Sequence, residues 1–115
     1  MEIMSGQDLR NSLNEIQTCL KDSLSKSRSR GLELAECERA YRLGRALEVR
    51  KEKALGTAST IMKDLVDGDV MVAELRFERD TALVLYKSAQ DAINVYKLNL
   101  RVIQEDMQRE YGNGK

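Results

Sequence analysis

The sequence predicts an all-α protein: an antiparallel, coiled-coil-like hairpin of two long helices with a short helical cap at its tip. Three observations predict this fold. The 115 residues contain no proline, so no ring disrupts a helix. Apolar residues recur at steps of three and four, the period of helices that pack against each other. Glycine-containing turn signals bracket one short segment, 55–69, between two long periodic regions.

The C-terminal helix is expected over residues 70–111, which contain neither glycine nor proline. The preceding Asp67-Gly68-Asp69 is turn chemistry, and the Asp69 carboxylate is a candidate N-cap for the free backbone N–H groups of the first turn. Gly112 is the type of residue at which helices end. The sequence therefore marks both ends of this helix.

One face of this helix carries an apolar seam that is expected to form the core or an oligomer contact. A period of about 3.5 residues predicts packing against a second helix with slight left-handed winding. The members of the seam are Val72, Leu75, Ala82, Tyr86, Ala89, Ile93, Tyr96, Leu100, Ile103 and Met107.

Arg79 is the single charged interruption of the seam. We expect its guanidinium to reach Glu48 or Glu52 of the facing helix, in an ion pair that fixes the register of the hairpin. Counting outward from the tip also places Tyr41 level with Leu83. The same count places Ile16 level with Met107.

A second apolar set lies off the seam. One partner helix cannot cover both sets, because a seam occupies only part of the helix circumference. We therefore expect homodimers or a higher oligomeric bundle. The set comprises Leu83, Val84, Leu85, Val95, Leu98 and Val102.

The N-terminal helix is expected over residues 7–54. Its apolar period breaks at 25–31, a serine-rich stretch that is either an exposed section of one long helix or a loop. We favour one helix, since serine and glycine each cost only about 0.5–1 kcal/mol relative to alanine. The alternative is a three-helix bundle in which this stretch turns the chain back. Residues 7–111 then form one helical domain, with disordered tails at 1–6 and 112–115.

The tip is expected over residues 55–69, with a short helix at 59–66. Ser59 or Thr60 is the candidate N-cap of that helix. Its apolar pairs are expected to plug the end where the two long helices meet. These pairs are Ile61 with Met62 and Leu65 with Val66.

The composition argues against catalysis and against a resident cofactor. There is no histidine, which removes the commonest general base and the commonest zinc ligand. Cys19 and Cys37 form no C-x-x-C pair and have no imidazole partner. Asp64, Asp67 and Asp69 lack the further ligand positions of a calcium loop. We therefore predict no enzyme activity, no cofactor, no metal site and no catalytic residue.

No secretory signal and no apolar run of membrane-spanning length is visible in the sequence. We therefore expect no membrane partner and a cytoplasmic location. The 19 basic residues balance 19 acidic residues, which argues against a protein that coats nucleic acid.

A basic stripe on the N-terminal helix keeps nucleic-acid binding open as the alternative function. Its residues fall within about a third of the circumference at ~100° per residue, where they could meet phosphates or an acidic partner. Against this reading stand interspersed glutamates, among them Glu36 and Glu38. The stripe comprises Arg39, Arg42, Arg45, Arg50 and Lys53.

Several motifs in residues 32–111 resemble a family of small, uncharacterised proteins of tailed phages and prophages of Gram-positive bacteria. They keep their order along the chain: Glu36–Arg42, Asp64–Asp69, Leu75–Asp80, Tyr86–Asn94, Lys97–Arg101 and Arg109–Tyr111. The family usually has a proline near the tip, where this chain reads Gly56–Thr60.

The resemblance implies a phage accessory protein in the cytoplasm of a bacterial host, from genes that lie near replication and recombination functions. It brings no established activity or site residues. The expected function is non-enzymatic and acts through contact with itself and with a host or phage protein, for example as an anti-CRISPR-like inhibitor of a defence nuclease. The alternative is a nucleic-acid-binding accessory of phage replication or recombination.

Overall fold

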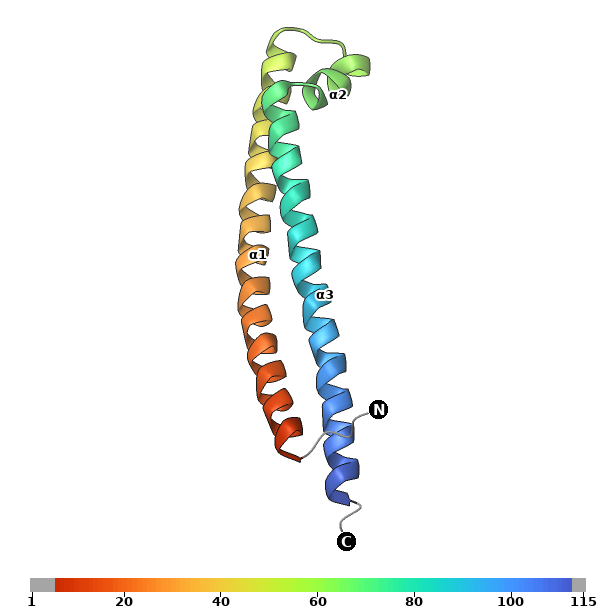
Figure 1. Ribbon diagram of the computed structural model, residues 1–115. Helices are drawn as coiled ribbons and strands as arrows, with labels where there is room; N and C mark the ends of the chain where they lie inside the picture. The colour runs from red at the N-terminus through yellow and green to blue at the C-terminus, as the bar shows by residue number, and fades with distance from the viewer. Residues whose placement is uncertain (1–5, 113–115) are drawn as a thin grey trace. The chain divides into compact units, whose positions relative to one another are not determined.

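The computed structural model describes residues 6–112, which form three helices and no strand (Figure 1). Helix α1 is Gly6–Ala54, α2 is Ser59–Asp67 and α3 is Val70–Gly112. Helices α1 and α3 pair antiparallel, which confirms the all-α class and the helical hairpin. Gly6 and Gly112 extend the two long helices by one residue beyond the predicted bounds. The rest of the expected tails, 1–5 and 113–115, lies outside the described residues.

The chain divides into two compact units. The tip unit is Ser29–Lys87 and holds the end of α1, all of α2 and the start of α3. Within the described residues, the terminal unit consists of 6–28 of α1 and 88–112 of α3. In each unit a segment of α1 packs against a segment of α3, so each unit has its own share of the apolar seam.

The serine-rich stretch 25–31 is helical, and α1 continues unbroken through it. The interpretation as one long helix is confirmed, and the three-helix bundle is wrong because α1 does not turn back. In the tip unit, Gly31 faces the ring of Tyr86: a Cβ at this position would lie 3.4 Å from Tyr86 Cε2. The missing side chain lets the aromatic ring approach the α1 backbone, which compensates for the lack of a large apolar residue here.

Helix α1 ends where the sequence places its stop signal. Gly56 has a φ of 77°, a left-handed conformation that glycine adopts without steric cost. The backbone N–H of Thr57 donates to the carbonyl of Glu52 at 3.1 Å, and the Thr57 hydroxyl lies 2.6 Å from the Glu52 carboxylate. These bonds satisfy groups at the end of the helix that would otherwise lack partners.

The two caps at the tip differ from each other. At α2, the N-cap is Ala58, which makes no side-chain bond, so the prediction of Ser59 or Thr60 as cap is wrong. At α3, the N–H of Val72 donates to Oδ2 of Asp69 at 3.1 Å, which confirms Asp69 as the N-cap.

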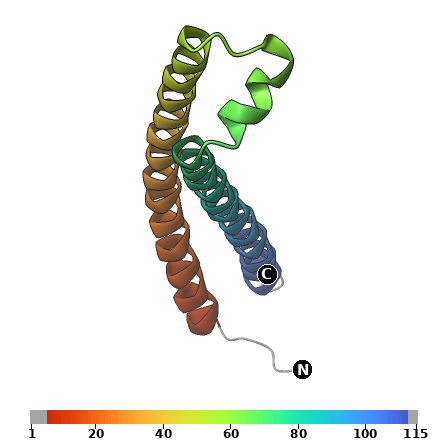
Figure 2. The same ribbon diagram turned by 90° about the horizontal axis from the view of Figure 1, so that it is seen from above.

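Helix α2 lies to one side of the ends of α1 and α3 within the tip unit (Figure 2), and only one of its faces is buried. Val66 is fully buried and Met62 is half-buried. Ile61 and Leu65 are exposed. The prediction that all four residues plug the end is therefore wrong for two of them, because a helix lying alongside its neighbours turns adjacent residues in different directions.

The predicted register of the hairpin is wrong by about one helical turn. Arg45 Nε lies 3.2 Å from the Asp67 carboxylate, just before α3 begins, and Gly44 lies against the side chain of Leu75. Helix α3 therefore starts beside α1 well before α1 ends (Figure 1). The count from the tip assumed that both helices reach the same level. As a result Tyr41 meets Arg79, one turn before the predicted Leu83.

Candidate interaction surfaces

The seam of α3 lies against α1 in both units. In the tip unit Val72 and Ala82 are buried, and in the terminal unit Ala89 and Ile93 are buried. The other seam residues are half-buried: Leu75, Arg79, Tyr86, Tyr96, Leu100, Ile103 and Met107. The seam thus forms the core of each unit, and its residues are not free to form an oligomer contact as well.

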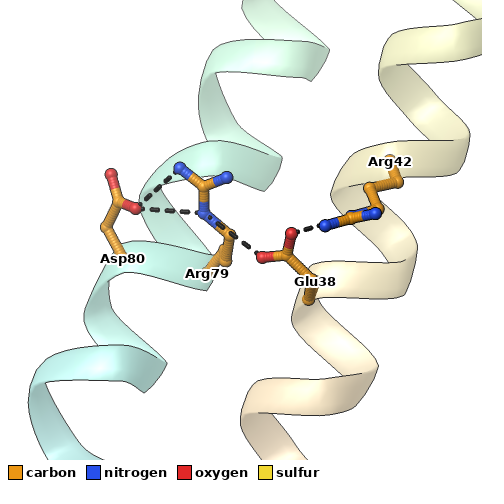
Figure 3. A network of polar contacts seen from close by, with 4 residues as sticks. All are labelled: Glu38, Arg42, Arg79 and Asp80. Carbon is orange, nitrogen blue, oxygen red and sulfur yellow. Dashed lines mark hydrogen bonds and ion pairs between the residues drawn. The ribbon is translucent and has the colours of Figure 1, made fainter.

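Arg79 lies at the centre of a polar network between the helices of the tip unit (Figure 3). Its guanidinium donates to the Asp80 carboxylate at 2.9 Å and lies 3.6 Å from the carboxylate of Glu38. Its carbon is 4.3 Å from the ring centroid of Tyr41. On α1, Arg42 Nε donates to the other Glu38 oxygen at 2.9 Å.

The predicted ion pair between Arg79 and the facing helix exists, but its partner is Glu38. In the observed register Glu48 and Glu52 lie nearer the end of α1 than the turn that faces Arg79. Glu52 accepts a hydrogen bond from Thr57 instead. The hydrogen bond that Arg79 donates to Asp80 is the main reason that the pKa of Arg79 is raised. Two carboxylates neutralise this one guanidinium, so the network fixes the register and offers no spare charge to an anion.

An open groove of about 620 Å³ runs beside this network in the tip unit. Its wall is mostly apolar, and its charged groups are already bonded to one another. The residues that line it are Gly31, Leu34, Ala35, Glu38, Arg79, Asp80, Leu83 and Tyr86.

A second groove, of about 340 Å³, lies between α1 and α3 in the tip unit and is acidic. Burial and the nearby carboxylates of Glu33, Glu78 and Glu36 raise the pKa of the Cys37 thiol, in that order of importance. The sequence pattern did not predict this groove, although Phe77 stands among glutamates in the sequence. The lining residues are Glu33, Cys37, Glu74, Phe77, Glu78, Thr81 and Ala82.

Ion pairs divide the basic stripe of α1. Arg42 is bonded to Glu38, and Arg45 is bonded to Asp67. The remaining members, Arg39, Arg50 and Lys53, are exposed and have no ion pair with any of residues 6–112. Two of the five cations of the stripe are thus already paired with carboxylates, which leaves three for contact with a phosphate backbone.

The second apolar set of α3 lies on the surface. In the terminal unit Val95, Leu98 and Val102 are 54%, 58% and 54% exposed. In the tip unit Val84 is 65% exposed, and Leu83 and Leu85 are more than one-third exposed. Within the described part of this single chain, no element covers these side chains.

The chemistry of residues 6–112 is otherwise sparse. No group of three His, Cys, Asp or Glu side chains in this range could hold a metal ion. No helix in the same range is both long and apolar enough to span a bilayer. Comparison with protein-family models, with curated proteins and with solved structures gives no match.

Proposed function

We propose that this protein is a non-enzymatic interaction protein that acts through the exposed apolar faces of its helices. The observation that carries the proposal is the patch of Val95, Leu98 and Val102 on the side of α3 away from the seam. Three β-branched or leucine side chains, each more than half exposed and adjacent at steps of three and four, are typical of a surface that a partner covers.

The more specific part of the proposal is an accessory role in a phage-infected bacterium, with inhibition of a host defence nuclease as one form. This part rests on the resemblance of residues 32–111 to phage proteins. The alternative, nucleic-acid binding through the basic stripe, has less support because Arg42 and Arg45 are already paired with carboxylates.

The test compares capture by two forms of the tagged full chain from extract of phage-infected bacteria. One is the wild type and the other carries Val95→Ser, Leu98→Ser and Val102→Ser, which keep the helix but remove the apolar surface. We expect a protein to be retained in stoichiometric amount by the wild type only. Equal capture by both forms, or none by either, would contradict the proposal.

A gel shift with duplex DNA at low salt tests the alternative. Binding that weakens steeply with salt, and that is lost in Arg39→Glu with Arg50→Glu, would favour the nucleic-acid function. For the defence-inhibitor form, expression of the protein in cells with an active CRISPR defence should restore plaque formation by a targeted phage. Unchanged plaque numbers would exclude that form.

A further inference from the structure

The tip unit carries two exposed faces of opposite charge, one on each long helix. The basic face of α1 consists of Arg39, Leu43, Leu47, Arg50 and Lys53. Leu43 and Leu47 are 56% and 63% exposed, and the three cations around them are exposed as well. The acidic residues of α1 in this stretch lie elsewhere: Glu48 and Glu52 are half-buried on the side toward the hairpin interior.

The acidic face of α3 consists of Glu74, Phe77, Glu78, Val84 and Leu85. Phe77 and Val84 are 66% and 65% exposed, and both glutamates are exposed beside them. Glu74, Phe77 and Glu78 also line the acidic groove, where Glu33 of α1 adds a further carboxylate. The raised pKa of Cys37 agrees with a negative potential at this place.

We propose, on the basis of the proposed function, that a second copy of this chain is a partner: the basic face of one copy docks on the acidic face of the next. The two faces match in charge and in apolar content, and every copy carries both. A contact between copies of one chain requires two exposed apolar faces that carry opposite charges, and each copy has one such face on each long helix.

The order of residues along the two faces fits an antiparallel docking. Arg50 and Lys53 stand at the C-terminal end of the basic face, and Glu74 and Glu78 at the N-terminal end of the acidic face. Leu43 lies seven residues before Arg50, a distance of roughly 10 Å along the helix.

Val84 lies six residues after Glu78, a distance of roughly 9 Å. When the charges meet, Leu43 therefore comes level with Val84 and Leu85, and Leu47 comes level with Thr81, one helical turn from Phe77. Antiparallel helices also place the dipole of each against the opposite dipole of the other.

The two faces lie on different helices and share no residue: the basic face lies on α1, and the acidic face lies on the flank of α3 that borders the acidic groove. One copy can therefore bind a neighbour with each face at the same time. Such a contact is heterologous: it adds copies until a ring closes, or continues as an open chain.

The test uses the full-length protein and two charge-reversed variants. The acidic-face variant carries Glu74→Lys and Glu78→Lys, and the basic-face variant carries Arg50→Glu and Lys53→Glu. Matched controls are Glu110→Lys on α3 and Lys26→Glu on α1, both exposed and outside the two faces. Circular dichroism checks that every variant keeps its helix content, and light scattering at about 50 mM salt gives the mass.

We expect the wild type and both controls to form species larger than a dimer as concentration rises. Each face variant alone should associate at least tenfold more weakly. In a mixture of the two variants the intact basic face pairs with the intact acidic face, and the two reversed faces pair with each other, so the mixture should regain association beyond a one-to-one complex. A single chain that carries all four substitutions should associate again, since the charges are exchanged on both sides.

A monomeric wild type, or association that neither variant weakens, would overturn the inference. A wild type that forms a dimer and grows no further as its concentration rises would also overturn the inference. These outcomes are separate from the proposed function: a monomer that still captures a host protein through Val95, Leu98 and Val102 would disprove self-association alone. Assembly by mixing without any captured protein would support self-association and contradict a foreign partner.

Discussion

The guanidinium carbon of Arg79 lies 4.3 Å from the centre of the Tyr41 ring, so a cation on α3 packs on the face of an aromatic ring on α1. The contact lies within the apolar seam. The carboxylate of Glu38, on the same helix as Tyr41, lies 3.6 Å from the Arg79 guanidinium. A charge in a seam lowers stability unless it is paired, and here it specifies which turn of α1 faces which turn of α3.

Arg79→Met is expected to leave the free energy of unfolding within about 1 kcal/mol of the wild type. Methionine keeps an apolar stem against Tyr41, while Glu38 retains Arg42 and Asp80 faces water. Arg79→Glu should cost about 1–2 kcal/mol more than Arg79→Met, because its carboxylate comes close to those of Glu38 and Asp80. Urea denaturation followed by circular dichroism measures both. Equal stability of the two variants would contradict the placement of residue 79 beside the carboxylates of Glu38 and Asp80.

Gly31→Ala is expected to stabilise the protein by up to about 1 kcal/mol, the helix-propensity difference. Its Cβ would rest in van der Waals contact with the Tyr86 ring. Gly44→Ala gains the same propensity, but its Cβ would overlap the Leu75 side chain, which must move. Melting temperatures should therefore rise more for Gly31→Ala than for Gly44→Ala. The reverse order would contradict the helix register in the tip unit.

Ile93→Asp is expected to lower the free energy of unfolding by about 3 kcal/mol or more, because it places an unpaired carboxylate in the core of the terminal unit. Val95→Asp is the matched control on the same helix. Val95 is more than half exposed, so this change should alter stability by only about 0.5 kcal/mol. Thermal melts of the two variants distinguish core from surface, and similar melts would disprove the seam.

Asp69→Ala is expected to cost about 1 kcal/mol, since it removes the acceptor for the N–H of Val72 at the start of α3. Asp69→Asn should restore most of this loss, because asparagine caps about as well as aspartate. Chemical denaturation of the three proteins gives the comparison. Loss in both variants to the same extent would indicate that the carboxylate charge, rather than the cap, stabilises this end.

Cys37 should make stability depend on pH at the alkaline end. Burial and Glu33 raise the pKa of its thiol from 9.0, so the folded chain keeps this proton to a higher pH than the unfolded chain. The unfolded state then binds fewer protons, and stability falls as the pH rises through 9 and above. The fall should be steeper in the wild type than in Cys37→Ser, measured by denaturation between pH 7 and pH 10. Parallel pH profiles would contradict the raised pKa.

Local sequence was enough to predict the helices and several of their ends. The absence of proline, the Gly56 stop and the Asp69 cap are properties of neighbouring residues, and all three act in the structure as expected. The seam could also be read from its period, because residues at steps of three and four must share a face. Arg79 within that seam correctly indicated an ion pair with the facing helix, but not its partner.

Which residue of α1 pairs with Arg79 depends on how α2 folds, and no local signal in the sequence specifies that. Ala58 begins α2 without a side-chain cap, and only one face of α2 is buried. The acidic groove likewise joins Glu33 of α1 to Glu74 and Glu78 of α3, residues that are far apart in the sequence. Such a juxtaposition could be predicted only with the correct register.

The amino-acid sequence by itself determined two long helices, the face that α3 buries and the excess of apolar residues on α3, since these follow from periodicity and from interactions over a few residues. The tertiary structure alone decided which turn of α1 meets which turn of α3, and hence that Arg79 pairs with Glu38. The physical reason is that a helix pair of regular period packs almost equally well when shifted by one turn. The geometry of the tip, the bond from Arg45 to Asp67 and the pair of Arg79 with Glu38 together select among these positions.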